Sequence, residues 1–181
     1  MDNIKPINLG NEIIRIHGLR KTDMLRLSFI EDDIYEILSN IDNVQYIPQR
    51  HITNKEDVSK LLLGVTFGYE TKSRWTHFIS LVESNNKVIG QIDILSPTLV
   101  EKNYGLKNIW LVEYLLHIDF WNKGIMTNTL GAVLKNIKEQ GITNIGALCQ
   151  RENINSIKVL EKVGFERKDT FDTKQDLFTF R

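Results

Sequence analysis

The chain has 181 residues, 41% hydrophobic and 25% charged, a balance that suits one globular domain spanning residues 1–181. Lys plus Arg and Asp plus Glu each total 23, so no basic surplus indicates nucleic acid or an anionic membrane as a partner. There is one cysteine, Cys149, and no Cys/His spacing typical of zinc. We therefore expect no disulfide, no metal, no membrane span and a cytoplasmic location.

In the first part of the chain, the hydrophobic pattern predicts one strand and two helices. The strand covers residues 12–16, and Ile spacing predicts the first helix over residues 32–40. The second helix follows Thr53, a candidate N-cap with Glu56 three residues later to complete a capping box. Its apolar stripe consists of Val58, Leu61, Leu62 and Val65.

Strand-favouring segments dominate from residue 75 to residue 118. Residues 75–82 and 87–94 flank a Ser-Asn-Asn turn, which predicts an antiparallel hairpin. After a looser stretch, residues 109–118 form the longest strand candidate. Because side chains alternate along a strand, two faces follow. One face carries Trp110, Val112, Tyr114, Leu116 and Ile118, and the other carries Leu111, Glu113, Leu115 and His117.

The last third of the chain alternates helices and strands. Helices are predicted over residues 125–140 and 154–162, and strands over residues 142–148, 165–170 and 177–181. The whole order is βαα, a run of strands, then αβαββ. This order predicts an α+β domain with a mixed, mostly antiparallel central sheet flanked by about four helices.

A glycine-bearing loop joins the strand at 109–118 to the next helix, with the sequence Trp121-Asn122-Lys123-Gly124-Ile125-Met126-Thr127. The first turn of a helix has N–H groups without intrahelical partners, and the helix dipole favours an anion there. Gly124 lets the backbone approach a bound group closely, while Lys123 adds a positive charge and Thr127 a hydroxyl. These features indicate a pyrophosphate cradle, although a single glycine before a helix is more often a plain turn.

A second segment, residues 153–165, reads Asn-Ile-Asn-Ser-Ile-Lys-Val-Leu-Glu-Lys-Val-Gly-Phe. By itself it is a helix with an Asn N-cap and a Gly C-cap. In this order, the two segments together resemble the acetyl-CoA signatures of the GNAT superfamily of N-acetyltransferases. The nearest branch is the ribosomal-protein N-terminal (alanine) acetyltransferases, and the resemblance in element order runs from Glu12 to the C-terminus.

The resemblance implies that acetyl-CoA lies in a splay of a GNAT-like sheet, beside the strand at 109–118. Backbone groups of that strand would pair with the pantetheine arm, at Leu115, Leu116 and His117. Backbone N–H groups of the loop would hold the pyrophosphate, around Asn122, Lys123, Gly124, Met126 and Thr127. Asn153 would contact the pantetheine chain, and Ser156 would lie near the sulfur.

The implied reaction is direct attack of a neutral amine on the thioester. Ser156 is the candidate donor to the leaving thiolate, the alternative being a helix serine that faces solvent. The chain departs from the family at several positions. Members of the nearest branch often have glutamate and glycine at the positions of Leu111 and Glu113. Many relatives have a tyrosine, acting as general acid, at the position of Leu160. The glutamate that often follows the loop threonine is Asn128 in this chain. The resemblance therefore supplies no general base.

Glu113 is the general base that the residues themselves favour. It alternates with apolar residues on a strand expected to be central, and a carboxylate there needs either a charged partner or a proton. The alternative is a glutamate on a half-exposed face of the sheet. Asp93 is a weaker candidate for the base, by the same argument. His117 could relay a proton, the alternative being a residue that contacts the cofactor through its backbone alone. Cys149 is expected to be a small buried hydrophobic residue.

The acceptor is expected to be an α-amine. Neutralising an α-amine of pKa about 7.7–8.0 at pH 7 requires about 1–1.4 kcal/mol, against about 4.6 kcal/mol for a lysine side chain. The predicted function is therefore acetylation of a protein or peptide N-terminus by a monomer or homodimer. Two alternatives are acetylation of a small amine, such as a polyamine, amino acid or antibiotic, and an acyl-CoA-binding regulator without catalysis.

Overall fold

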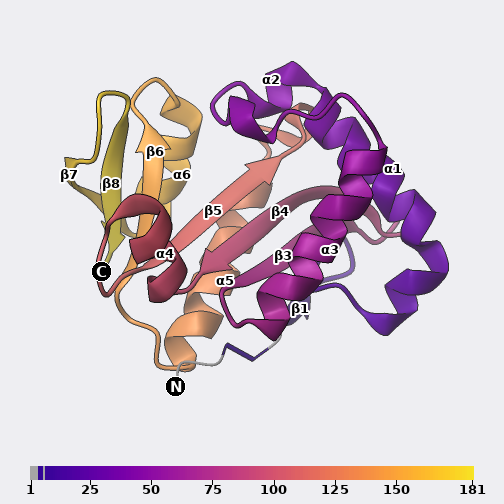
Figure 1. Cartoon of the computed structure of the whole chain (residues 1–181), viewed down its shortest axis with the longest axis horizontal. Helices are drawn as coiled ribbons and strands as arrows, with labels where there is room; N and C mark the ends of the chain where they lie inside the picture. The colour runs from indigo at the N-terminus through magenta and orange to yellow at the C-terminus, as the bar shows by residue number, and fades with distance from the viewer. Residues whose placement is uncertain (1–3, 6) are drawn as a thin grey trace.

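An eight-stranded sheet runs through the computed structural model, which describes residues 4–5 and 7–181 (Figure 1). Residues 1–3 and 6 of the expected domain lie outside the described part. The strands are β1 (Asn8–Gly10), β2 (Ile14–His17), β3 (Arg74–Leu81), β4 (Lys87–Leu95), β5 (Trp110–Leu116), β6 (Ile145–Gln150), β7 (Phe165–Thr170) and β8 (Gln175–Phe180). The α-helices are α1 (Leu27–Ser39), α2 (Ile41–Val44), α3 (Glu56–Glu70), α4 (Pro97–Tyr104), α5 (Ile125–Glu139) and α6 (Ile154–Lys162). Three short 3-10 helices are η1 (Lys21–Arg26), η2 (Pro48–Arg50) and η3 (Ile118–Phe120).

The sheet has the order β1-β2-β3-β4-β5-β6-β8-β7. Every neighbouring pair is antiparallel except β5 and β6, which are parallel. The prediction of a mixed, mostly antiparallel sheet is therefore confirmed. The single parallel pair follows from the chain order, because α5 crosses over between β5 and β6 and returns the chain in the same direction.

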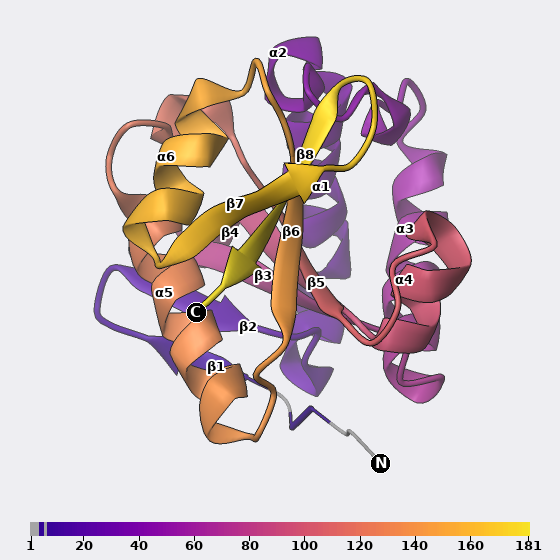
Figure 2. The same cartoon turned by 90° about the vertical axis from the view of Figure 1, so that its left-hand side faces the viewer.

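Helices cover both faces of the sheet, as Figure 2 shows with α5 and α6 on one side and α1, α3 and α4 on the other. On the α5 side, Leu130, Val133 and Leu160 pack against Trp110 and Val112 of β5. On the α1 side, the apolar faces of α1 and α3 pack against β3, β4 and β5. The alternation predicted for β5 is thus confirmed over residues 110–116. In the described residues, no helix combines the length and the apolar character that crossing a membrane requires.

Several element boundaries differ from the sequence prediction. Helix α1 begins at Leu27, five residues before the predicted start at 32, because η1 leads directly into it. The capping box at Thr53 is wrong, since α3 begins at Glu56 and the side chain of Asn54 accepts the Glu56 N–H at 2.9 Å. Strand β5 ends at Leu116, and β6 begins three residues later than the predicted start at 142.

One further strand and two further α-helices were not predicted, and the two helices bring the described residues to six α-helices where about four were expected. Strand β1 pairs with β2 as an edge hairpin, and α2 is a single turn after α1. Helix α4 replaces the looser stretch. Its signals were present in the sequence, because Ser96 caps it, Pro97 occupies its first turn and Gly105 ends it at φ 71°.

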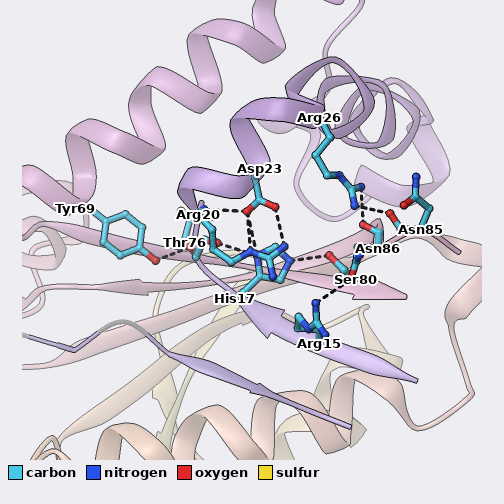
Figure 3. Close-up of polar contacts among 11 residues, drawn as sticks. Arg15, His17, Arg20, Asp23, Arg26, Tyr69, Thr76, Ser80, Asn85 and Asn86 are labelled. Atoms are coloured by element: carbon cyan, nitrogen blue, oxygen red, sulfur yellow. Dashed lines mark hydrogen bonds and ion pairs between the residues drawn. The ribbon is translucent and has the colours of Figure 1, made fainter. Parts of the chain in front are cut away.

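A buried polar cluster fixes η1 and the start of α1 on the sheet (Figure 3). The ring of His17 on β2 lies between the carbonyl of Gly18 at 2.8 Å and the hydroxyl of Ser80 at 3.0 Å. The carboxylate of Asp23, on η1, accepts from the guanidinium of Arg20 at 2.7 Å and 3.0 Å and lies 3.7 Å from His17. Arg26 donates to the carbonyls of the β3–β4 turn. These contacts join the segment that leads into α1 to β2 and to the β3–β4 turn.

Candidate active site

The two parallel strands β5 and β6 separate soon after they meet. They pair only at Trp110–Ile145 and Leu111–Gly146, while β5 continues to Leu116 and the rest of β6 pairs with β8. The N–H of His117 donates across to β4, to the carbonyl of Ile89 at 2.8 Å. Because N–H directions alternate along a strand, the N–H of Leu116 faces the opening toward β6. The structure therefore contains the splay that the resemblance implied.

The loop before α5 opens at one end of this splay. Gly124 is the N-cap of α5, with φ 73° in the left-handed region, and no side chain caps the helix there. Asn122, two residues earlier, is also left-handed at φ 59°. The first-turn N–H groups of α5 thus lack a side-chain partner, and the helix dipole adds positive potential. This geometry can bind an anion such as a phosphate group.

A first cavity of about 260 Å³, here the cofactor cavity, extends from this loop to the start of α6. Eight residues predicted to bind cofactor line it: Leu115, Leu116, Asn122, Gly124, Met126, Thr127, Asn153 and Ser156. Two predicted residues do not. The Lys123 ammonium lies 5.5 Å from the ring centroid of Phe120, and the His117 ring accepts the N–H of Asp119 at 3.2 Å. The proton relay suggested for His117 gains no support from this position.

A second cavity of about 160 Å³ lies in the splay itself, between residues 111–114 of β5 and 147–150 of β6, and is called the acceptor cavity after the role proposed for it below. Both predicted catalytic residues, Glu113 and Ser156, border it. Five residues line both cavities: Tyr46, Ile47, Tyr114, Asn153 and Ser156. The two cavities therefore meet between β5 and the first turn of α6, where a group from one can reach a group in the other.

Glu113 carries charged and polar partners. Its carboxylate accepts from the Arg50 guanidinium at 2.7 Å and from the Tyr104 hydroxyl at 2.7 Å, and Arg74 lies 3.6 Å away. Its side chain remains 27% exposed, so solvent or a ligand in the acceptor cavity can reach it. Glu113 is therefore an ion-paired carboxylate at a cavity wall, and it is neither unpartnered nor turned outward.

Asp93 lies directly across from Glu113, on β4, and is fully buried. Thr76, Gln91 and Arg50 donate to its carboxylate, Arg50 at 2.8 Å and Gln91 at 2.9 Å. Burial disfavours the charged form, but the nearby arginines outweigh it and hold the pKa of Asp93 below its usual value. Asp93 does not line the acceptor cavity, so it is a fixed negative charge behind Glu113.

The segment from Tyr46 to Arg50 lines the acceptor cavity, and none of its residues was among the predicted catalytic or cofactor-binding residues. Besides the Arg50 pair, the Tyr46 carbonyl accepts from the Gln150 side chain on β6 at 2.7 Å. This segment therefore bridges β4 and β5 to β6 over the splay. Arg50 lies 63 residues and Tyr104 9 residues from Glu113 in the sequence. No sequence motif links residues at these separations, and they come together only when the chain folds.

Ser156 and Cys149 lie on the wall shared by α6 and β6. Asn153 caps α6, as predicted, by accepting the Ser156 N–H at 3.1 Å. The Ser156 hydroxyl lies 2.7 Å from the hydroxyl of Tyr114. Cys149 is 4% exposed, and burial raises the pKa of its thiol, which agrees with the expectation of a small buried residue.

Comparison with known proteins agrees with this geometry. A family model described as an acetyltransferase (GNAT) domain matches residues 24–166. The uncharacterised N-acetyltransferase YnaD of Bacillus subtilis strain 168 is 26% identical over 139 residues, which cover 76% of this chain and 74% of that protein. The chain belongs to the GNAT acetyltransferase family, and it is an N-acetyltransferase.

Solved structures of ribosomal-protein acetyltransferases share the fold. RimL, the ribosomal L7/L12 alpha-N-protein acetyltransferase solved with coenzyme A, superposes with a TM-score of 0.71 at 15% identity, over 97% of this chain and 96% of that one. The ribosomal-protein-S5-alanine acetyltransferase of Vibrio fischeri superposes with a TM-score of 0.68 at 16% identity, over 96% and 94%. At these identities the likeness concerns the fold.

Proposed function

We propose that this protein, as a single acetyltransferase domain, uses acetyl-CoA to acetylate the α-amine of a protein or peptide N-terminus, of the ribosomal-protein type. The observation that carries the proposal is the pair of cavities that meet at the splay. One is bordered by the uncapped start of α5 and the other by the paired carboxylate Glu113. Two substrates, one in each cavity, would meet between β5 and α6.

The residues of the cofactor cavity fit acetyl-CoA. The uncapped α5 start suits the pyrophosphate, and the edge of β5 that β6 leaves unpaired suits the amide-bearing pantetheine arm. Asn153 and Ser156, at the start of α6, border the point where the two cavities join. Acetyl-CoA supplies an activated acetyl thioester to the reaction. Lys123 and His117 lie outside this wall, so the proposed cofactor set consists of the eight residues that line it.

Three groups of the chain have proposed roles in the reaction. The N–H of Leu116 stabilises negative charge that develops on the acetyl oxygen. Glu113 accepts the proton that the amine loses, directly or through one water. Ser156 donates a hydrogen bond to the departing sulfur. Holding the two reactants together supplies a further part of the rate, since fixing both can contribute on the order of 7–11 kcal/mol.

The charge of the acceptor cavity favours a monoamine over a polycation. Glu113 and Asp93 are balanced by Arg50 and Arg74, so the site offers no surplus of negative charge to a polyamine. An α-amine is also the easier nucleophile, because its pKa of about 7.7–8.0 leaves a useful neutral fraction at pH 7. The fold likeness to ribosomal-protein acetyltransferases points to the same acceptor class.

The acceptor class is tested by thiol release from acetyl-CoA across a panel of amines. The panel contains peptides with a free N-terminal alanine or serine and no lysine, N-terminally blocked peptides with one lysine, and free polyamines and amino acids. We expect release with the first group at least tenfold faster than with the others at pH 7.5. Mass spectrometry of the products would place the acetyl group on the α-nitrogen.

Other outcomes assign the protein differently. Faster release with a polyamine or amino acid would replace the peptide acceptor with a small amine. Acetyl-CoA binding by calorimetry without release on any amine would support a regulator and reject the proposal. Failure to bind acetyl-CoA at all would reject the assignment of the cofactor cavity.

A further inference from the structure

Tyr114 occupies a position at the junction of the two cavities that no signature of the sequence assigns. It lies on β5, one residue after Glu113, and its side chain points to the opposite face of the sheet, toward α6. Its hydroxyl lies 2.7 Å from the Ser156 hydroxyl and 3.2 Å from the Ser156 carbonyl. Tyr114 borders both the cofactor cavity and the acceptor cavity. It is thus the side chain from β5 that directly contacts the proposed thiolate donor.

We propose that Tyr114 is a positioning residue for acetyl transfer, which orients the hydroxyl of Ser156 so that its proton points at the departing sulfur. The inference rests on the proposed function, since it requires the sulfur to lie at the start of α6.

The hydrogen-bond count supports this role. A tyrosine hydroxyl has one proton and a serine hydroxyl one proton and two acceptor sites. When Tyr114 donates to the Ser156 oxygen across the shorter contact of 2.7 Å, the serine proton is free for a third group. The backbone N–H of Ser156 donates to the side-chain oxygen of Asn153, the N-cap of α6, at 3.1 Å, and this hydrogen bond fixes the backbone of Ser156. Either hydroxyl can donate across the 2.7 Å contact. With Tyr114 as the donor, Ser156 is held from two directions and keeps its own proton for a group at the cavity junction.

Tyr114 acts as a hydrogen-bond donor and keeps its own proton. A thiol such as that of coenzyme A resembles free cysteine, with a pKa of about 8.5, while tyrosine has about 10. Burial raises the pKa of Tyr114 further, so the phenol does not surrender its proton to the thiolate. The charge that develops on sulfur is stabilised by Ser156, by Tyr114 through Ser156, and by the N-terminal end of the α6 dipole. The proton that finally neutralises the thiolate is the one that the amine loses to Glu113, and it reaches the sulfur from Glu113 through solvent.

The alternative is that Tyr114 only ties β5 to α6. The test compares Tyr114→Phe with Tyr69→Phe, because Tyr69 is, like Tyr114, a half-buried tyrosine. Its hydroxyl donates to the carbonyl of Thr76 at 2.8 Å, outside both cavities (Figure 3). We expect Tyr114→Phe to lower kcat roughly tenfold, the effect of one hydrogen bond, with KM for acetyl-CoA unchanged. Tyr69→Phe should lower the melting temperature and leave kcat at the wild-type value.

A double-mutant cycle separates positioning from stability. If Tyr114 acts through Ser156, then Tyr114→Phe combined with Ser156→Ala should be no more than twofold slower than Ser156→Ala alone. Independent effects that multiply, or a Tyr114→Phe enzyme with wild-type kcat, would overturn the inference. Failure of the wild-type protein to bind acetyl-CoA or release thiol would instead reject the proposed function, so the two failures are distinguishable.

Discussion

Glu113 and Asp93 face each other across β5 and β4, and the same guanidinium, that of Arg50, joins both carboxylates. Two like charges directly opposite on a sheet are destabilising unless a counter-ion lies between them. Asp93 is closed off by Thr76 and Gln91, whereas Glu113 opens to the acceptor cavity. Of this pair, only Glu113 can meet an amine.

At the residue scale, replacing Glu113 tests its role as the proton acceptor. We expect Glu113→Gln to lower kcat/KM for an α-amine peptide by roughly 10²–10⁴ at pH 7, the usual contribution of a general base. The deficit should narrow by no more than about tenfold above pH 9, because neutralising an α-amine of pKa about 7.7–8.0 accounts for only about 1–1.4 kcal/mol at pH 7. The measurement is the pH dependence of initial rates in both proteins.

The control is Glu101→Gln on α4, a half-exposed glutamate that does not line either cavity. It makes the same chemical change and should leave the rate at every pH equal to that of wild type. If Glu113→Gln retains full activity at pH 7 while its melting temperature is normal, another group accepts the proton.

At the element scale, the start of α5 depends on a left-handed residue. Gly124 and Gly105 have nearly the same conformation, φ 73° and 71°, and a Cβ on either would meet no atom within 4 Å. Gly105 ends α4 and borders neither cavity, whereas Gly124 lines the cofactor cavity. The two glycines therefore share a backbone requirement and differ in what lies beside them.

Replacing Gly124 or Gly105 with alanine should lower the stability of the protein by similar amounts, but only one of the two variants should bind acetyl-CoA more weakly. A left-handed alanine is strained by roughly 1–2 kcal/mol, so both variants should melt a few degrees lower. Only Gly124→Ala should weaken acetyl-CoA binding, by at least tenfold, because its Cβ would occupy the space that a pyrophosphate needs. Calorimetric titration of both variants measures this, and equal affinities would mean that the loop before α5 does not hold the cofactor.

At the scale of the whole molecule, buried histidines make stability depend on pH. His77 on β3 is fully buried, and among the described residues neither ring nitrogen has a hydrogen-bond partner. Burial lowers the pKa of His77 from 6.5 to about 4, and that of His17 is also lowered, chiefly by burial. Both rings are therefore neutral in the folded chain under conditions that protonate them in the unfolded chain.

The direction of the pH effect follows from proton binding. Between pH 6.5 and about 4 the unfolded state binds more protons at residue 77, so folding stability falls as the pH is lowered through this range. His77 alone should reduce the free energy of unfolding by about 2 kcal/mol between pH 7.5 and pH 5. Urea unfolding at several pH values measures the slope, and His77→Phe should flatten it. An unchanged slope in the variant would contradict the assignment to His77.

The sequence by itself determined the parts of this protein that depend on neighbouring residues. The faces of β5, the start of α5 at Gly124, the Asn153 cap and the two acetyl-CoA signatures are all local patterns, because periodicity and capping act within a few residues. Those patterns were sufficient for the family and the sheet class, and eight of the ten residues that they proposed for cofactor binding line one cavity. They misplaced the start of α1 and the cap of α3, where several polar residues compete for the same cap.

Only the tertiary structure decided what lies around the reacting groups. The splay exists because β5 and β6 stop pairing after two residue pairs. The residues of the two strands do not by themselves predict where this pairing ends. Arg50 meets Glu113, and Tyr114 meets Ser156, across 63 and 42 residues of chain. Long-range contacts of this kind arise from packing of whole elements, and one sequence carries no local signal for them. The physical reason is that hydrophobic periodicity fixes which face of an element is buried, while the partner across that face is chosen only when the elements pack.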